Sequence, residues 1–277
     1  MKWQADFEDS QVQLFRRLAA HPPDSSLRLV ILAAHPDDET LGASVVLARF
    51  PSSRVIYLTD GAPRDTHLWP PSMVGSRQDY AEVRRSEVAK VLAHVGISTE
   101  QVFWLGGIDQ EATFDIRTLL ARLVEFLHAW RMDLLITHPY EGGHPDHDSA
   151  ALVARLTARS LGSEAPVISE MTSYHVRNGQ CVTGEFLNPE PASEIALELS
   201  EDDRRRKRRM LDGYRSQRLV LERFPIVTER FRIAPAYDFS HPPHDGRLWY
   251  ECMGWAMTGA RWREVAVAAS EQAQGCS

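Results

Sequence analysis

The feature that most constrains this chain is an acidic turn at residues 35–39, His-Pro-Asp-Asp-Glu. The apolar run before it, Leu-Val-Ile-Leu-Ala-Ala at 29–34, is typical of a buried strand, and residues 40–48 after it are typical of a helix. One imidazole and three carboxylates at such a junction are costly unless a cation joins them. Helix capping explains one of the acids, because carboxylates favour helix N-termini, but it does not explain three acids and a histidine. The turn therefore favours a metal site.

Strand-like and helix-like segments alternate along the chain as far as residue 219. The predicted strands are 29–34, 54–59, 101–105, 133–137 and 167–175, and the predicted helices are 10–20, 40–48, 77–94, 114–130, 149–161 and 201–219. This alternation predicts an α/β fold, a Rossmann-like three-layer sandwich with a mostly parallel sheet and an irregular C-terminal extension. We expect a single domain over residues 1–277, with a core at about 28–218 and an extension at about 219–277 beside the substrate pocket.

A second polar cluster, at residues 138–148, follows the fourth predicted strand directly. Its spacing His144-x-x-His147 places two imidazoles on one face of a first helical turn. In a doubly wound sheet of order 3-2-1-4-5, strands 1 and 4 are neighbours, and ligands bind beyond their carboxyl ends. We therefore expect His35 and Asp38 to face His144 and His147 across one crevice.

The two clusters together offer one donor more than a catalytic zinc needs, because such a metal takes three protein ligands and leaves a position for water. The four candidates are His35, Asp38, His144 and His147. Metal-bound water becomes acidic near pH 7, so a nearby carboxylate can take its proton, and Asp37 is the natural choice. The spare histidine would protonate a leaving amine or stabilise an oxyanion. Asp146 would hold that histidine in the right tautomer and raise its pKa.

Other kinds of site fit the sequence less well. No Gly-x-Gly-x-x-Gly follows the first strand, and the chain has no Gly-x-Ser-x-Gly elbow and no His-Glu-x-x-His pair. A structural metal more often has four ligands, usually with cysteine. The three cysteines, Cys181, Cys252 and Cys276, are too scattered for a Cys-x-x-Cys site or a disulfide framework.

Charge and hydropathy restrict the partners. The net charge of −7 and the pI of about 5.9 argue against a general attraction to nucleic acid or anionic membranes. The acidic N-terminus lacks the apolar core of a secretory signal, and no apolar run approaches the roughly 18 residues that cross a bilayer. We expect a cytoplasmic protein with a small-molecule substrate and no nucleic-acid or membrane partner. The sequence leaves its oligomeric state open.

The motifs Ala34-His35-Pro36-Asp37-Asp38-Glu39 and His144-Pro145-Asp146-His147 resemble the signature of the PIG-L/LmbE family of zinc-dependent N-acetylglucosaminyl deacetylases. Two further segments, 84–87 (Arg-Arg-Ser-Glu) and 214–217 (Tyr-Arg-Ser-Gln), also resemble family sequence, so the resemblance covers most of residues 28–218. It implies these roles: metal ligands His35, Asp38 and His147, general base Asp37, and electrostatic or general-acid partner His144 supported by Asp146.

The resemblance also implies an activity. It predicts a hydrolase that removes the N-acetyl group from an N-acetylglucosamine-type amino sugar or its conjugate, with Zn²⁺ as cofactor. Two histidines and a carboxylate suit Fe²⁺ as well, so the ligand set does not choose between the two ions. The alternatives are an amidase that cleaves a larger thiol–sugar conjugate, and a non-catalytic sugar-binding module on the same fold.

Candidates for substrate contacts are fewer. Some family members carry a tyrosine two residues before the first histidine of the second motif, and here Gly142 holds that position, so either Tyr140 or Glu141 takes the role or no residue does. Arg64 lies in the loop after the second strand, beside the expected crevice. In the C-terminal extension, Trp249 or Trp262 is suited to stack on a sugar, and His244 is a further candidate. Structural packing is the alternative for each of them.

Other charged residues are predicted to be structural. Arg84 and Glu87 are three residues apart on one helix and are expected to form an ion pair. The six basic residues at 204–209 are expected to form a solvated helix face. His138, at the end of the fourth strand, is expected to pack beside the site and not to bind a metal.

Overall fold

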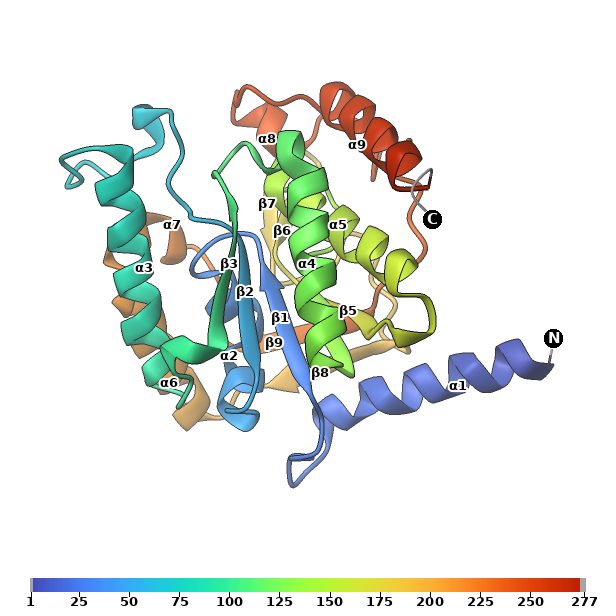
Figure 1. Ribbon diagram of the computed structural model, residues 1–277. Helices are drawn as coiled ribbons and strands as arrows, with labels where there is room; N and C mark the ends of the chain where they lie inside the picture. Colours follow the sequence, from blue (N-terminus) through green and yellow to red (C-terminus); the bar gives the residue numbers. More distant parts are fainter. Residues whose placement is uncertain (1, 275–277) are drawn as a thin grey trace.

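The computed structural model describes residues 2–274, so Cys276 lies outside the described residues. The strands are β1 (Leu29–Ala33), β2 (Arg54–Thr59), β3 (Val102–Gly107), β4 (Leu134–Thr137), β5 (Val167–Met171), β6 (Tyr174–Arg177), β7 (Gln180–Thr183), β8 (Glu194–Glu198) and β9 (Thr228–Ile233). The helices are α1 (Lys2–Arg16), α2 (Asp38–Arg49), α3 (Arg77–Ala93), α4 (Ile116–Trp130), α5 (Pro145–Leu161), α6 (Glu201–Gly213), α7 (Arg218–Leu221), α8 (Trp249–Cys252) and α9 (Gly259–Gln274). Figure 1 shows how they are arranged around a central sheet.

The central sheet has seven strands in the order β3-β2-β1-β4-β5-β9-β8. The first five in this order are parallel, as the sequence predicts, and their order 3-2-1-4-5 confirms the expected doubly wound core. β9 and β8 extend the sheet in antiparallel pairing beyond β5. The strands β6 and β7 form a separate hairpin. The predicted α/β fold class is therefore confirmed.

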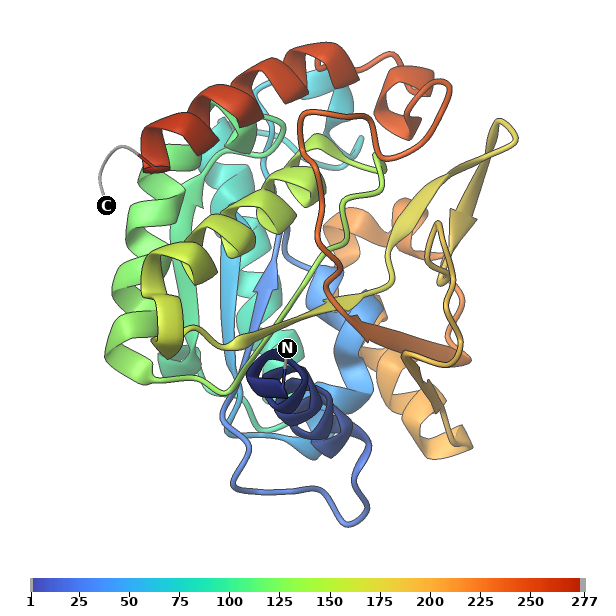
Figure 2. The same ribbon diagram turned by 90° about the vertical axis from the view of Figure 1, so that its right-hand side faces the viewer.

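The sheet is covered on both faces because its central strands are apolar on both sides. All five residues of β1 are buried, and they alternate between the two cores. Leu29 and Ile31 pack with residues of α2, α3 and α6, whereas Val30 and Leu32 pack with residues of α4, α5 and α9. Figure 2 shows the second group of helices on one side of the sheet and α2 and α6 on the other.

Several predicted boundaries shift in the structure. The single strand predicted at 167–175 was wrong, because β5 ends at Met171 and the chain turns before β6 begins at Tyr174. Helix α6 ends at Gly213, short of the predicted residue 219. Helix α5 begins at Pro145, four residues earlier than predicted, because His144 serves as its N-cap and proline is well accepted in a first turn.

The irregular structure predicted from residue 233 was wrong for the last part of the chain. Helix α9 covers 16 residues there and buries Trp262, Ala266 and Ala269 on the side that packs against α4 and α5. The spacing of these residues, four and then three, is the periodicity of an amphipathic helix. The proline-rich and glycine-rich stretch before it obscured that pattern. Among the described residues, no helix combines the length and the apolar character needed to span a bilayer.

The basic run on α6 is only partly the solvated face that the sequence predicts. Lys207 is buried, and its ammonium donates hydrogen bonds to Glu229 Oε1 at 2.8 Å and to the Leu41 carbonyl at 2.6 Å. Glu229 also accepts from the Ser44 hydroxyl at 2.5 Å and from the backbone N–H of Val45 at 3.0 Å. The Lys207–Glu229 pair therefore joins α6, β9 and the middle of α2.

The Lys207–Glu229 pair gives a stability prediction. Lys207→Met should lower the free energy of unfolding by about 3–5 kcal/mol, because it leaves the Glu229 carboxylate buried without a counter-charge. Urea denaturation measures this loss. Arg205→Met, on the exposed side of the same helix, is the control and should change stability by less than about 0.5 kcal/mol. Equal effects of the two substitutions would contradict the structural role of the pair.

Candidate metal centre

The turn 35–39 is held in an unusual backbone conformation at the start of α2. Asp37, the N-cap residue, has φ 112° and ψ −30°, in the left-handed region that non-glycine residues seldom adopt. The Glu39 carboxylate accepts the Asp37 backbone N–H at 3.0 Å, and the Asp37 carbonyl accepts the N–H groups of Thr40 and Leu41. Strain of this kind persists where the surrounding contacts determine the backbone, and it concentrates at functional sites.

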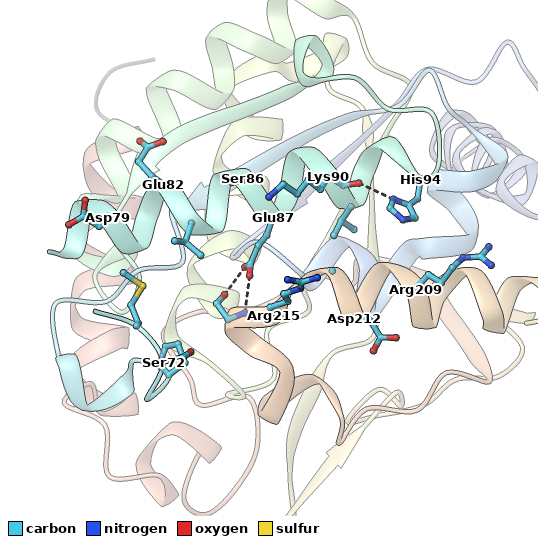
Figure 3. A pocket seen from close by; sticks show the side chains of 16 residues that line it. Ser72, Asp79, Glu82, Ser86, Glu87, Lys90, His94, Arg209, Asp212 and Arg215 are labelled. Carbon is cyan, nitrogen blue, oxygen red and sulfur yellow. Dashed lines mark hydrogen bonds between the residues drawn. The ribbon is translucent and has the colours of Figure 1, made fainter. Parts of the chain in front are cut away.

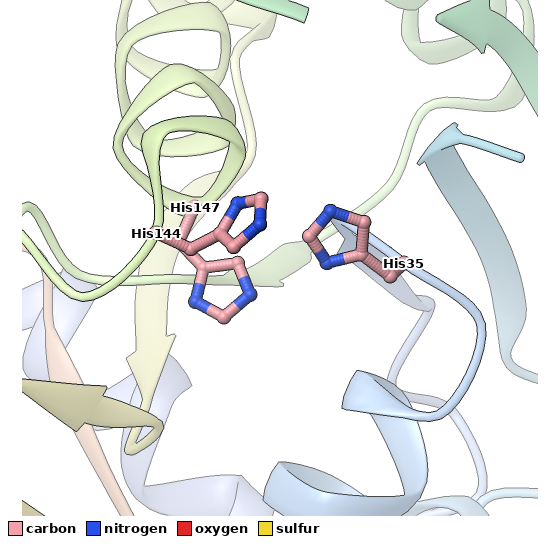
Figure 4. A group of neighbouring side chains, drawn as sticks. All are labelled: His35, His144 and His147. Atoms are coloured by element: carbon pink, nitrogen blue, oxygen red, sulfur yellow. The ribbon is translucent and has the colours of Figure 1, made fainter. Parts of the chain in front are cut away.

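The predicted metal donors meet at the carboxyl ends of β1 and β4. Figure 4 shows His35 facing His144 and His147, which project from the start of α5. Asp38 Oδ2 lies 3.3 Å from His35 Nδ1 and 3.4 Å from His147 Nε2. The side chains are all buried, His35 at 8% exposure being the most accessible of the three histidines. The two clusters therefore form one site, as the order of the strands requires.

The described residues contain three overlapping groups of possible metal donors. Within each group, the donor atoms lie within 4.8 Å of one another. The groups are His35, His144 and His147; His35, Asp109, His144 and Asp146; and Asp38, His138 and His147. The predicted ligands are divided between these groups, with His147 shared by the first and the third. Asp109 and His138 are additions that the sequence analysis did not propose as donors.

Two of the donor spacings fit a small divalent cation, although no one of the three groups contains His35, Asp38 and His147 together. In tetrahedral zinc sites, bonds of about 2.0–2.1 Å to nitrogen or oxygen separate the donors by about 3.3–3.4 Å, the spacing of Asp38 Oδ2 from His35 Nδ1 and His147 Nε2. His147 Nδ1 is paired with the Ser173 hydroxyl at 3.2 Å, while its buried Nε2 has no hydrogen-bond partner among the described residues. A cation bound between this nitrogen and the Asp38 carboxylate would give the nitrogen a partner.

Two of the predicted ligands already have the protonation state that a metal needs. Burial lowers the pKa of His147 to about 3, so its imidazole is neutral. Burial opposes ionisation of Asp38, but the imidazoles of His147 and His138 that face its Oδ2 hold the pKa of its carboxyl well below its usual range. Metal binding requires deprotonated ligands, so neither residue has to give up a proton.

His35 is different, because carboxylates surround it. Its Nε2 lies 3.2 Å from Asp109 Oδ1 and 3.1 Å from Asp146 Oδ2. Burial would lower the pKa of His35, but the charge of Asp109 and the hydrogen bonds that the ring donates to Asp109, Asp146 and Asp38 raise it well above its usual value. His35 therefore carries a proton in the metal-free protein, and a metal that binds there displaces it.

Asp37, the predicted general base, is paired with Arg84. The Arg84 guanidinium, 2% exposed, donates to Asp37 Oδ2 at 3.0 Å and to the Pro36 carbonyl. Burial raises the pKa of Asp37 to about 7, although the charge of Arg84 opposes the rise. Gly61 makes room for this pair, since a Cβ at that position would lie 2.8 Å from Arg84 Nε and from Pro36 Cδ.

The ion pair predicted between Arg84 and Glu87 is present, but it is the longer of the two that Arg84 makes. Its Nη1 lies 3.8 Å from Glu87 Oε2, whereas its Nη2 lies 3.0 Å from Asp37. Glu87 instead accepts from the N–H and the hydroxyl of Ser216, at 2.8 Å and 2.6 Å, and Arg84 also donates to that hydroxyl. The segments 84–87 and 214–217, far apart in sequence, thus form one support under Asp37.

A groove of about 930 Å³ lies between α3 and α6, on the outer side of this support. Figure 3 shows Glu87 at its floor, bonded to the segment that follows α6. The groove is lined mainly by polar residues of α3 and α6, and the predicted metal donors are not among its described lining residues. The metal centre and the groove are therefore separate features, joined by Glu87 and Ser216.

Glu39, the third acid of the turn, faces away from the donor atoms. Its Oε1 accepts from the hydroxyls of Thr40 at 2.5 Å and Tyr214 at 2.6 Å, and its Oε2 accepts the Asp37 N–H. Burial raises its pKa above the usual value. Its contacts orient the turn.

Asp146 acts differently from the prediction. Its backbone N–H donates to His144 Nδ1 at 3.1 Å, and its carboxylate Oδ2 lies farther from that nitrogen, at 3.9 Å. The carboxylate accepts the N–H groups of Gln110 at 2.7 Å and Ala112 at 3.2 Å and also faces His35. The predicted rise in the pKa of His144 was wrong, because burial and the neighbouring His35 lower it well below its usual value.

His138 packs beside the site as predicted, and it also makes direct contacts with His147 and Asp38. Its ring stacks on His147 with centroids 3.9 Å apart, and its Nε2 accepts the Ala34 N–H at 3.0 Å. The same nitrogen lies 3.4 Å from Asp38 Oδ2. The Ala34 backbone N–H occupies the lone pair of His138 Nε2. We therefore assign His138 the role of positioning His147 and Asp38, which it contacts.

The predicted substrate contacts lie at different distances from the centre. Arg64 is exposed and pairs with Glu111, Nε to Oε1, at 2.9 Å. Tyr140 is buried, stacks on Trp262 and donates its hydroxyl to a backbone carbonyl of the C-terminal segment, that of His241, at 2.9 Å. Trp262 is fully buried, so packing accounts for both rings.

The remaining candidates lie on the segment that covers the site. Trp249 is half-buried, and its backbone N–H donates to the Gly142 carbonyl at 2.9 Å. His244 is half-buried, with Nδ1 2.7 Å from the Asp245 carbonyl oxygen. Trp255, which the sequence analysis did not single out, contacts His144 directly, edge to face, with ring centroids 4.7 Å apart. Residues 248–255 therefore form a wall over the second cluster.

A family model described as "PIG-L: GlcNAc-PI de-N-acetylase" matches residues 30–158. The matched segment runs from β1 into α5 and contains both polar clusters and all the donor groups described above. Comparison with curated protein sequences found no match.

Solved structures share the fold. The deacetylase of the pseudoaglycone of the antimicrobial reagent A40926 matches with a TM-score of 0.56 and 17% identity, over 78% of this chain and 99% of that chain. N,N'-diacetylchitobiose deacetylase from Pyrococcus horikoshii, solved with its inhibitor MPG, matches with a TM-score of 0.53 and 19% identity, over 83% and 93%. A 4-carboxy-2-hydroxymuconate hydratase from Pseudomonas putida KT2440 gives a TM-score of 0.52 and 14% identity, over 76% and 98%. Since deacetylases and a hydratase share it, the fold alone does not assign a reaction.

Proposed function

We propose that this chain, whose residues 30–158 match the PIG-L family model, is a metal-dependent hydrolase that removes the N-acetyl group from an N-acetylglucosamine-type amino sugar or its conjugate. The observation that carries the proposal is the position of Asp38 Oδ2, 3.3 Å from His35 Nδ1 and 3.4 Å from His147 Nε2, with the carboxylate of the preceding residue, Asp37, held by Arg84. In this proposal His35, Asp38 and His147 hold the metal, with Zn²⁺ as the expected ion and Fe²⁺ as the alternative.

The cation, when bound, would polarise the acyl carbonyl and make water acidic enough to attack it near neutral pH. Asp37 takes the proton of the attacking water on its carboxylate. Arg84 and Glu39 keep that carboxylate in place, the first through its guanidinium and the second through the Asp37 backbone N–H. A base with a pKa near neutrality is ionised in a large fraction of the molecules at neutral pH. It also binds a proton strongly enough to take one from the attacking water.

His144 is placed to act on the acyl oxygen. Its Nδ1 accepts the Asp146 backbone N–H, so a neutral imidazole carries its proton on Nε2. That N–H donates to the oxygen as negative charge develops on it, an interaction that strengthens toward the transition state. Collapse of the tetrahedral species breaks the C–N bond, the proton held by Asp37 passes to the leaving nitrogen, and acetate and a free amine result.

The proposal is made for an amino-sugar substrate because of the family. GlcNAc-phosphatidylinositol de-N-acetylation is the activity in the family description, and one structural neighbour acts on N,N'-diacetylchitobiose. The proposal includes a small-molecule substrate, a cytoplasmic location and a single domain. A panel of N-acetylglucosamine conjugates, assayed for acetate and for the free amine, tests the substrate class. Cleavage of a thiol conjugate alone would favour the amidase alternative, and binding without acetate release would favour the sugar-binding module.

Metal dependence gives the first prediction. Chelation should abolish acetate release, and added Zn²⁺ or Fe²⁺ should restore it. His147→Ala should lose bound metal because it removes one of three ligands, and elemental analysis of the purified protein measures the loss. His94→Ala, which changes the exposed histidine that follows α3, is the matched control and should keep its metal. Full metal content in His147→Ala would contradict the ligand assignment.

The role of Asp37 gives the second prediction. Asp37→Asn should lower kcat by about 10²–10⁴-fold, because the amide cannot accept the proton of water. Asparagine is also accepted in the left-handed backbone region, so the turn and the metal content should stay intact. A variant that turns over at the rate of the wild type, with its metal in place, would remove Asp37 from this role.

The pKa of Asp37 gives the third prediction. Below this pKa the carboxyl is protonated and cannot act as a base, so kcat/KM should fall tenfold per pH unit on the acidic side. The pKa of about 7 belongs to the metal-free site, and a nearby cation lowers it. Arg84→Gln removes the charge that opposes the rise, and it should shift the acidic limb to higher pH. Metal content measured at each pH separates this effect from protonation of the ligands, and an unshifted limb would contradict the assignment.

A further inference from the structure

Gln110 lies in the turn between β3 and α4, at the edge of the metal centre. It has φ 70°, in the left-handed region, although it is not glycine. Its backbone N–H donates to Asp146 Oδ2 at 2.7 Å, and the next bond along the turn, from Ala112 N–H to Asp146 Oδ1, is 3.2 Å. A buried carboxylate thus fixes the backbone of this residue, while its side chain is only half-buried.

The side-chain amide of Gln110 contacts His144. The position of its terminal Nε2 lies 2.7 Å from His144 Nε2, so the two ends of the amide have to be assigned from the hydrogen bonds around them. His144 Nδ1 already accepts the Asp146 N–H, so in the neutral ring Nε2 carries the proton and must donate it. The amide atom that faces Nε2 is therefore the carbonyl oxygen of Gln110, an orientation that the hydrogen bonds decide because the two ends of an amide are nearly equal in shape.

This contact uses the one N–H that His144 directs into the site. In the proposed function the same N–H donates to the acyl oxygen of the substrate. A glutamine side chain ends in a carboxamide, which is the functional group of an N-acetylated amine. One residue of the chain thus offers His144 the same kind of acceptor as the substrate.

We propose that the carboxamide oxygen of Gln110 occupies the place of the substrate's acyl oxygen and is a built-in competitor for His144 that the substrate must displace. This inference rests on the proposed function, since it uses the role of His144 in that reaction. The fixed backbone keeps Gln110 beside the site, and rotation of its side chain removes the carboxamide from Nε2. The residue then tunes how tightly an amide substrate binds, and it takes part in no bond-making step.

Substitutions at residue 110 should change amide binding in opposite directions. Gln110→Gly removes the competitor and suits the positive φ, so it should bind acetamide about 3- to 10-fold more tightly, the gain from one hydrogen bond that no longer has to be exchanged. Gln110→Glu places a carboxylate on the same N–H and should bind acetamide more weakly than the wild type, because bonds to a charged acceptor are stronger. Gln110→Asn keeps the amide on a shorter side chain and should behave like the glycine variant.

The test uses the zinc-loaded full-length chain labelled with ¹⁵N-histidine, with acetamide as the probe. In the wild type, the His144 Nε2 resonance should be that of a protonated, hydrogen-bonded nitrogen, and the Nε2 proton should move upfield in Gln110→Gly. Acetamide titration of the wild type and the three variants gives the affinities. Unchanged acetamide affinity and an unchanged Nε2 resonance in Gln110→Gly would overturn the proposal, as would failure of acetamide to bind any variant.

These readouts need no turnover, so they are separate from the test of the proposed function. If no N-acetylated sugar is hydrolysed but acetamide binding follows the expected order, the proposed reaction is rejected and competition by Gln110 for His144 is supported. If hydrolysis occurs and acetamide affinity is the same in all variants at residue 110, competition by Gln110 is rejected and the proposed reaction is supported.

Discussion

The parallel pairing of β1 with β4 is the constraint on which the metal centre depends. Leu29 is level with Leu134 and Ile31 with Ile136, so the two strands end together at one edge of the sheet. The acidic turn and the start of α5 then open toward each other, and Asp38 Oδ2 lies 3.3–3.4 Å from His35, His138 and His147. A slip of one residue between the strands would move one cluster by about 3.3 Å, which is as large as those donor distances. Strand register therefore determines whether the donors can share a cation.

Much of the site could be predicted because it follows local rules. The turn and the His144-x-x-His147 spacing stand directly after apolar strands, and the order of an alternating α/β chain places strands 1 and 4 side by side. The sequence was sufficient to bring His35, Asp38 and His147 together.

Other parts could not be predicted because they depend on contacts between distant segments. Nothing local to Arg84 indicates that it pairs with Asp37 and not only with Glu87 three residues away. Asp109 and Gln110 follow β3 at the same edge of the sheet, and that position was the available signal for them. The direction of the His144 pKa shift depends on burial and on His35, neither of which is visible in the spacing of Asp146. Helix α9 was not predicted because the segment before it is rich in proline and glycine, a composition that indicated irregular structure for the whole C-terminal extension.

The support under Asp37 has a consequence for the order in which the site is assembled. All the donor groups are complete once the chain has reached residue 148, and the segment that matches the family model ends at residue 158. Tyr214 and Ser216, which hold Glu39 and the Arg84–Glu87 pair, come much later in the chain. Since a chain emerges from the ribosome N-terminus first, the metal donors can gather before the residues that orient the base exist. In the proposed function, the residues that aim the Asp37 carboxylate are therefore translated after all the residues that would hold the cation.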